Sequence, residues 1–224
     1  MPAGSPGPVS SFVDRVQAGR VLGEHVARRL GPLGTPAPVV VAVPRGGVPV
    51  GAGVAHLLGA SLIVMPVGKV GAPGHEELAV GAVAPGGVTV LNQGVISALR
   101  LSSDLVYELV QRAAEKVLRQ EEAYRADRPL PPSLEGRCAV VVDDGLATGA
   151  SMRAALTAVR RQGPGRVVLA VPVAPPEVLA GLAPWVDEEV CPVQPWHMEA
   201  VGAWYDDFSQ TTDEEVLSYL AGSA

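Results

Sequence analysis

The sequence has few cysteines, few aromatic residues and no excess of positive charge. Two of its 224 residues are cysteine, Cys138 and Cys191, and they form no CxxC pair. This usage argues against a disulfide framework and against a cysteine-held metal, so we expect two buried thiols. Lysine and arginine number 17 against 23 acidic residues, a net charge of −6. That balance opposes the phosphate neutralisation on which nucleic-acid binding depends, so no nucleic-acid partner is expected.

Long apolar runs are also missing, although 48% of the residues are hydrophobic. Glycine, proline or a charge interrupts every such stretch before the roughly 18 residues that a membrane span requires, so no membrane partner is expected. The first residues, MPAGSPGPVSS, have neither a basic start nor an apolar core. We therefore expect a cytoplasmic protein with a flexible tail over residues 1–11. Residues 12–224 fit one domain large enough to bury its own core.

Short β-branched runs alternate with helical patterns through most of the chain. We expect strands at 39–43, 62–67, 139–142, 167–171 and 186–190. Helices are expected at 13–30, 48–60, 149–162, 176–182 and near the C-terminus. Strands joined by crossover helices run parallel. The fold class is therefore predicted to be α/β, with a mostly parallel sheet covered by helices on both faces.

The middle of the chain departs from this alternation. Residues 78–83 and 88–91 flank the sequence APGG, which predicts a β-hairpin. Residues 103–125 carry the longest helical pattern. Between the second strand and the hairpin, KVGAPGHEE at 69–77 is rich in glycine and polar residues, so we expect an irregular, mobile loop there.

The stretch that carries most chemical information is VVVDDGLATGAS, residues 140–151. A buried strand ends in two adjacent carboxylates, Asp143 and Asp144, and a glycine-containing loop then opens a helix. Backbone N–H groups and the positive end of a helix suit a phosphate. Ionised carboxylates only accept hydrogen bonds, so the acids require donors or a cation. A ribose diol and Mg²⁺ meet that requirement, which indicates a site for a ribose 5-phosphate group.

This stretch resembles the phosphoribosyl diphosphate (PRPP) motif of type I phosphoribosyltransferases. VAVPRGGVPV, KVGAPGHEELAVGAV and AVGAWYDDFSQTTDEEV resemble one bacterial subgroup of proteins with that domain. The resemblance implies that Asp143 and Asp144 contact the ribose hydroxyls and hold Mg²⁺, directly or through water. It implies that the following loop binds the substrate, chiefly its 5′-phosphate, through Gly145, Ala147, Thr148, Gly149, Ala150 and Ser151.

VPRGG, residues 43–47, stands where the family has its diphosphate loop. Gly46 and Gly47 allow the backbone to approach a ligand closely, and the planar guanidinium of Arg45 can hold a diphosphate. The resemblance further implies a cis peptide bond between Pro44 and Arg45. Residues 69–77 stand where family members carry a flexible catalytic loop, with Lys69 as the cation that reaches the diphosphate.

The resemblance implies Mg²⁺-dependent transfer of phosphoribosyl from PRPP to a nitrogenous base, or the reverse cleavage, with release of diphosphate. A small hood outside the core sheet would hold the base, with Trp204 and Tyr205 as candidates for stacking on it. Members acting on 6-oxopurines place a third acid where this chain has Ala147, so adenine, a pyrimidine or an unusual acceptor remains open.

Two other functions stay open from the sequence. The first is a module that senses PRPP or a nucleotide without turnover, since the same loop can bind without catalysis. The second, favoured less, is a metal-dependent phosphohydrolase that uses both acids. Family members are often dimers, which implies a homodimer without indicating an interface.

Overall fold

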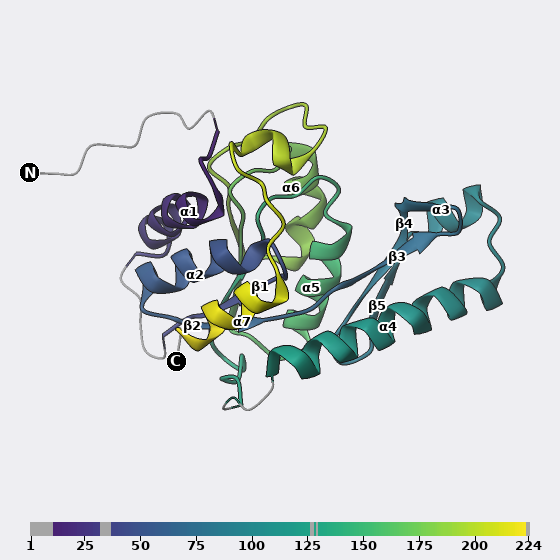
Figure 1. Ribbon diagram of the computed structural model, residues 1–224, viewed down its shortest axis with the longest axis horizontal. Helices are drawn as coiled ribbons and strands as arrows, with labels where there is room; N and C mark the ends of the chain where they lie inside the picture. The colour runs from purple at the N-terminus through teal and green to yellow at the C-terminus, as the bar shows by residue number, and fades with distance from the viewer. Residues whose placement is uncertain (1–10, 32–36, 126–127, 129, 223–224) are drawn as a thin grey trace, which may run out of the picture.

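The computed structural model of the chain describes residues 11–31, 37–125, 128 and 130–222. Its centre is a sheet of five parallel strands in the order β2-β1-β6-β7-β8 (Figure 1). The strands are β1 (Val39–Ala42), β2 (Ser61–Val64), β6 (Cys138–Val142), β7 (Arg166–Ala170) and β8 (Glu188–Val190). The predicted parallel sheet is confirmed, with strand ends shifted by up to three residues.

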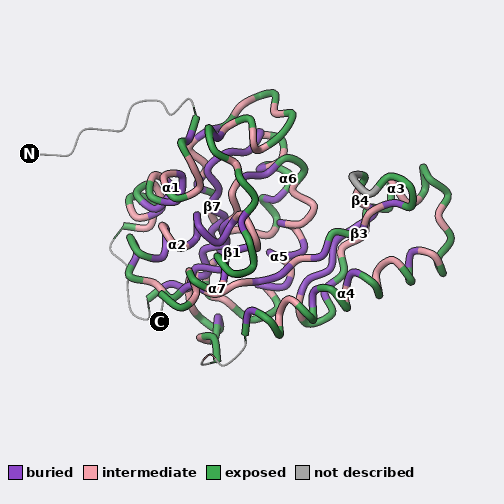
Figure 2. The backbone as a smooth tube through the Cα atoms, in the orientation of Figure 1, coloured by how far each residue is buried: buried purple, intermediate pink, exposed green. Residues whose placement is uncertain are grey.

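Helices cover both faces of this sheet, as predicted. Val40 and Ala42 of β1 pack in one apolar cluster, and Val39 and Val41 in another, because alternate residues of a strand face opposite sides. The sheet is accordingly buried between its helices (Figure 2). The first cluster lies under α1 (Arg15–Leu30), α2 (Gly47–Leu58) and α7 (Asp213–Ala221). The second lies under α5 (Ala150–Arg160) and α6 (Pro176–Leu182), with the 3-10 helix η1 (Ala183–Trp185) packed against it.

A second sheet and a long helix form an arm that extends from the main body (Figure 1). The predicted hairpin is confirmed as part of a three-stranded antiparallel sheet, and the long helix has the predicted bounds. A short helix within the arm was not expected. The arm comprises β3 (Gly68–Ala72), β4 (His75–Ala84), β5 (Val88–Leu91), α3 (Gln93–Ala98) and α4 (Ser103–Arg125).

The prediction of an irregular loop at residues 69–77 is wrong, while the mobility predicted for this segment stays a prediction. These residues form β3 and the start of β4, joined by a turn in which Gly74 has φ +73°. Val70 and Ala72 are buried against α4. A β-carbon on Gly68 would lie 2.9 Å from Val117 Cγ2. This glycine therefore allows a strand to approach a helix closely, a role that its local sequence does not show.

Replacing Gly68 by alanine is expected to loosen the arm. The added methyl group would also lie 3.0 Å from the carbonyl oxygen of Ala113, which is backbone and cannot rotate away. We expect a loss of about 1–3 kcal/mol in the free energy of unfolding, measured by urea titration. Gly94→Ala is the matched control, since its β-carbon would meet only the Asn92 side chain at 3.4 Å. Equal stability of the two variants would contradict the tight strand-to-helix contact.

The segment before α1 lies beside residues 204–206. The backbone N–H of Phe12 donates to Trp204 O, the last residue of the 3-10 helix η2 (Val201–Trp204), and Asp206 N donates to Phe12 O, both at 2.8 Å. Phe12 is fully buried, and the predicted tail falls mostly on residues 1–10, outside the described residues. The helix expected near the C-terminus is confirmed as α7, which begins with a capping box between Thr212 and Glu215.

Two further expectations concern the thiols and the membrane. Cys138 and Cys191 are free and half-buried rather than fully buried. Burial raises the pKa of the Cys191 thiol to about 12, so this thiol stays protonated at neutral pH.

Within residues 11–222, apart from the gaps given above, no helix combines the length and the apolar character that a membrane crossing would require.

Candidate functional site

The two sequence motifs meet at the carboxyl edge of the main sheet. β1 and β6 are neighbours in register, with Ala42 opposite Val142, so the segments that follow them leave the sheet together. Val43 N donates to Val142 O at 2.9 Å, which extends the pairing one residue into the VPRGG loop. The carboxyl ends of parallel strands are where open α/β sheets bind ligands.

Gly46 and Gly47 lie directly against the acidic pair. A β-carbon on Gly46 would overlap Asp144 Oδ2, and one on Gly47 would lie 2.9 Å from Asp143 Cα and 3.0 Å from Asp143 Oδ1. No side chain larger than hydrogen fits at either position without moving the acids. Gly46 and Gly47, predicted to allow close approach to a ligand, thus allow the VPRGG loop to approach the two carboxylates.

The acidic pair is electrostatically crowded. Burial, together with the adjacent charge of Asp144, holds the pKa of Asp143 well above its ordinary value. Burial also raises the pKa of Asp144, although the hydrogen bond and charge of Arg15 act against that rise. The backbone N–H of Asp144 donates to Asp143 Oδ1 at 2.9 Å. The two neighbouring carboxylates therefore require hydrogen-bond donors or a cation.

The loop from Gly145 to Ser151 leads from the acids to the N-terminus of α5. A β-carbon on Gly145 would lie 2.6 Å from Val201 Cγ1, so the loop is pressed against the C-terminal segment. Gly149 caps α5 in the left-handed region with φ +71°, a conformation that favours glycine. Ala147 and Thr148 are exposed, whereas Gly149, Ala150 and Ser151 are half-buried. The loop thus offers exposed backbone at a helix N-terminus, the geometry of an anion site.

Arg15, the first residue of α1, is a member of the site that the sequence did not reveal. Its Nε lies 2.8 Å from Asp144 Oδ2, and the two side chains are only 11% and 14% exposed. Its Nη1 donates to Ser209 O at 2.6 Å, and its guanidinium lies over the ring of Phe208, 3.8 Å from the centroid. No local motif marks Arg15, because its partner is 129 positions away in the sequence.

The two predicted cations have different settings. Arg45 is half-buried in the loop after β1, and the Pro44–Arg45 peptide bond is cis, as the resemblance implied. Lys69 is an exposed strand residue of β3 rather than part of a loop. Met65 N donates to Ala42 O at 2.9 Å, so the chain is still at the carboxyl edge four residues before Lys69.

The predicted base-stacking residues do not form one exposed aromatic surface. Tyr205 is buried, with its ring 5.5 Å from that of Phe12 and 5.0 Å from that of Phe208. Its hydroxyl donates to the carbonyl oxygen of Asp144 at 2.6 Å. Stacking of Tyr205 on a base is therefore contradicted, because packing already covers the ring and the residue supports the acidic pair. Trp204 is half-buried, and Trp196 is 81% exposed.

The family model of the phosphoribosyl transferase domain matches residues 18–181, most of the chain and both motifs. The chain belongs to the phosphoribosyl transferase family. Two Mycobacterium tuberculosis proteins named as candidate phosphoribosyl transferases are 43% identical to it over 209 residues. Those residues are 93% of this chain but 46% of each relative, so the chain spans about half of their length.

Two solved structures have folds similar to that of this phosphoribosyl transferase domain. The crystal structure of TT1426 from Thermus thermophilus is 46% identical and superposes with a TM-score of 0.77, covering 96% of this chain and 99% of that one. AQ2163 from Aquifex aeolicus, 15% identical, superposes with a TM-score of 0.51 over 92% of this chain and 85% of that one, a likeness of fold alone.

The acidic pair has the donor chemistry that suits Mg²⁺ in a phosphoribosyl transferase domain. Carboxylate oxygens are hard ligands, and Mg²⁺ is commonly held by one or two of them together with water and substrate phosphates. Among the residues that the structure describes, no three His, Cys, Asp or Glu side chains gather around one point. The chemistry of Asp143 and Asp144 thus fits a magnesium ion.

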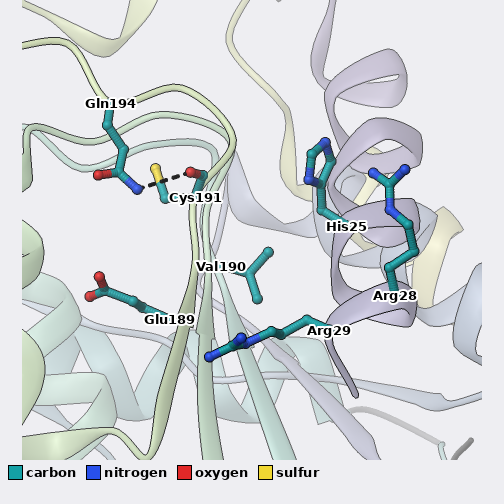
Figure 3. A pocket seen from close by; sticks show the side chains of 7 residues that line it. All are labelled: His25, Arg28, Arg29, Glu189, Val190, Cys191 and Gln194. Atoms are coloured by element: carbon teal, nitrogen blue, oxygen red, sulfur yellow. Dashed lines mark hydrogen bonds between the residues drawn. The ribbon is translucent and has the colours of Figure 1, made fainter. Parts of the chain in front are cut away.

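A separate hollow of about 600 Å³ lies between α1 and β8 (Figure 3). Both signs of charge line it, and Gln194 Nε2 donates to Cys191 O at 3.1 Å. Burial and the charge of Arg28 lower the pKa of His25 in this hollow. The hollow shares no residue with the acidic pair or with the loop that follows it, so it is not the predicted phosphoribosyl site. Its lining residues are His25, Arg28, Arg29, Glu189, Val190, Cys191 and Gln194.

Proposed function

We propose that this domain binds PRPP at the carboxyl edge of β1 and β6 and transfers its phosphoribosyl group to a nitrogenous base. The bond between the anomeric carbon and the diphosphate oxygen breaks, and diphosphate leaves with the electron pair. A bond from that carbon to a nitrogen of the base forms, and the nitrogen loses its proton. The reverse cleavage uses the same groups.

One observation carries this proposal: the diphosphate loop contacts the acidic pair, and the loop that follows the acids leads directly to the N-terminus of α5. Gly46 and Gly47 touch Asp144 and Asp143, and the loop to Gly149 follows the acids directly. PRPP has a diphosphate, a ribose diol and a 5′-phosphate in that order along the molecule. The three parts of the site are arranged in the same order.

Each group has a role that follows from charge. The acids accept hydrogen bonds from the ribose hydroxyls, and the backbone from Ala147 to Ser151 donates to the 5′-phosphate. Arg45 and Lys69 stabilise the negative charge that develops on the leaving diphosphate. When bound, Mg²⁺ supplies further charge neutralisation, and Asp143 and Asp144 are the residues that would hold it, directly or through water.

The acceptor is proposed to be a base other than a 6-oxopurine. Ala147 stands where members acting on 6-oxopurines carry an acid, and this exposed methyl group cannot hydrogen-bond a base. Adenine, pyrimidines and unusual nitrogenous acceptors fit this position better. Trp204, half-buried in η2, is the remaining candidate from our sequence analysis for stacking on the base.

Release of diphosphate from PRPP and Mg²⁺ across a panel of nucleobases tests the proposal. We expect release with at least one base other than hypoxanthine or guanine. Arg45→Ala should lower the turnover number by about a hundredfold, since loss of one cation from a developing charge typically has an effect of that order. Arg29→Ala, which changes an exposed arginine outside the site, should leave turnover unchanged. PRPP binding without release over every base would refute the transferase and favour the sensing module.

A further inference from the structure

The guanidinium of Arg15 is held on three sides at the edge of the acidic pair. Nε donates to Asp144 Oδ2 at 2.8 Å, Nη1 donates to Ser209 O at 2.6 Å, and the ring of Phe208 lies 3.8 Å below Cζ. Arg15 Nε would also lie 3.0 Å from a β-carbon on Gly46, so it borders the diphosphate loop. The backbone of Arg15 is also held in place, because the preceding residue, Asp14, caps α1 by accepting a hydrogen bond from Gln17 N at 2.7 Å.

The two carboxylates each use one oxygen within the protein. Asp144 Oδ2 accepts from Arg15, and Asp143 Oδ1 accepts from the backbone N–H of Asp144. An ionised carboxylate has about four lone-pair sites, so Asp144 Oδ1 and Asp143 Oδ2 can accept from ligand hydroxyls.

We propose that Arg15 is a positioning residue of the phosphoribosyl site, and this rests on the proposed function. By holding one oxygen of Asp144 against Gly46, it directs the other oxygen toward a ribose hydroxyl of PRPP. It also ties this orientation to the C-terminal segment through Ser209 and Phe208. Arg15 thus acts through Asp144 and affects the ribose contact rather than the phosphate contact.

A second arginine of α1 serves as a control that distinguishes the positioning of Asp144 from ion pairing in general. Arg29 lies near the other end of α1 and pairs with Glu188 Oε2 at 3.1 Å, but its side chain is 62% exposed. Exposed ion pairs contribute little, whereas hydrogen bonds between enclosed charged groups are strong and directional. Arg29→Met is therefore the matched control for Arg15→Met.

The test is calorimetric titration with two probes, PRPP with Mg²⁺ and orthophosphate alone. Arg15→Met should weaken PRPP binding about tenfold to a hundredfold, the range for one hydrogen bond to a charged group. Orthophosphate, which we expect to bind at the loop before α5, should keep its affinity within about twofold. Arg15→Lys should recover part of the PRPP affinity, because one ammonium donor can still reach Asp144. Arg29→Met should change neither affinity.

A double-mutant cycle with Asp144→Asn decides whether Arg15 acts through Asp144. If it does, Arg15→Met should cause no further loss of PRPP affinity in the Asp144→Asn background. Equal losses for PRPP and orthophosphate, or additive losses in the cycle, would overturn the positioning role. Failure of the wild-type protein to bind PRPP would refute the proposed function itself. Wild-type binding with an unchanged Arg15→Met variant would refute only the role of Arg15. Should Arg15→Met not fold, Arg15→Lys carries the same comparison.

Discussion

Gly46→Ala is expected to reduce the affinity for PRPP by at least about a hundredfold, since two or more hydrogen bonds to charged groups would be lost. The new methyl group would occupy the position of Asp144 Oδ2. The carboxylate would have to turn away from Arg15, and it would then no longer present its second oxygen to a ribose hydroxyl. The diphosphate loop could instead move outward, which would remove its own contacts with the ligand. Both responses damage the same site, so the predicted loss does not depend on which one occurs.

Calorimetric titration with PRPP and Mg²⁺ measures this loss, and circular dichroism checks the fold. The matched control is Gly181→Ala, because nothing lies within 4 Å of a β-carbon at that position. Gly181 lies in α6, where alanine favours a helix by about 0.5–1 kcal/mol over glycine, so this variant should keep its affinity and gain slightly in stability. An unchanged affinity in Gly46→Ala would show that PRPP does not bind where the two motifs meet.

The sequence alone revealed the parts of the fold whose signals are local. The β-branched runs of the main sheet and the long helix α4 were predicted with bounds close to those observed. The candidate site was also visible, because its acids and its loop are contiguous between Val140 and Ser151. The cis bond at Pro44–Arg45 came only from the family resemblance.

The remaining features depend on contacts between distant segments. Gly68 resembles a loop residue in sequence, and only α4 lying across it explains why glycine occupies a strand. Arg15 reaches the site because α1 packs along α2 and starts beside the C-terminal segment. Tyr205 was expected to face a base, but its ring fills the space between Phe12 and Phe208. Helical and strand periodicities carry no information about such pairings.

Asp143→Asn is expected to stabilise the ligand-free protein at neutral pH while it weakens PRPP binding by about tenfold or more, the effect of one charged hydrogen bond. The wild-type protein keeps two neighbouring carboxylates half-buried, and the pKa of Asp143 is well above 3.8. Asparagine removes one charge and keeps an oxygen that can accept from Asp144 N. We expect a gain of about 1–2 kcal/mol in the free energy of unfolding, or about 3–6 °C in Tm for a domain of this size.

The pH dependence of this gain follows from the direction of the pKa shift. As pH rises above about 4, the unfolded chain loses the Asp143 proton before the folded protein does. The wild-type protein therefore loses stability between that pH and the raised pKa, whereas the variant does not. Urea titrations in buffers without Mg²⁺ should show a difference in stability that is small at pH 4 and grows as the pH rises toward neutrality. A gain that is constant from pH 4 to 8 would contradict titration of Asp143 as its source.

Asp144→Asn tests whether the stability gain expected for Asp143→Asn comes from the removal of a crowded charge. The alternative is that asparagine stabilises any position at this edge of the main sheet. Its carboxylate is paired with Arg15 at 2.8 Å, so neutralising it leaves the enclosed guanidinium without its counter-charge. Because burial still raises the pKa of Asp144, relief from burial offsets the lost ion pair, and we expect a change of less than about 1 kcal/mol, smaller than the gain at Asp143. A smaller gain at Asp144 than at Asp143 would mean that Arg15 compensates Asp144 more than Asp143. The less compensated charge of Asp143 then serves ligand binding at the expense of the stability of the empty protein.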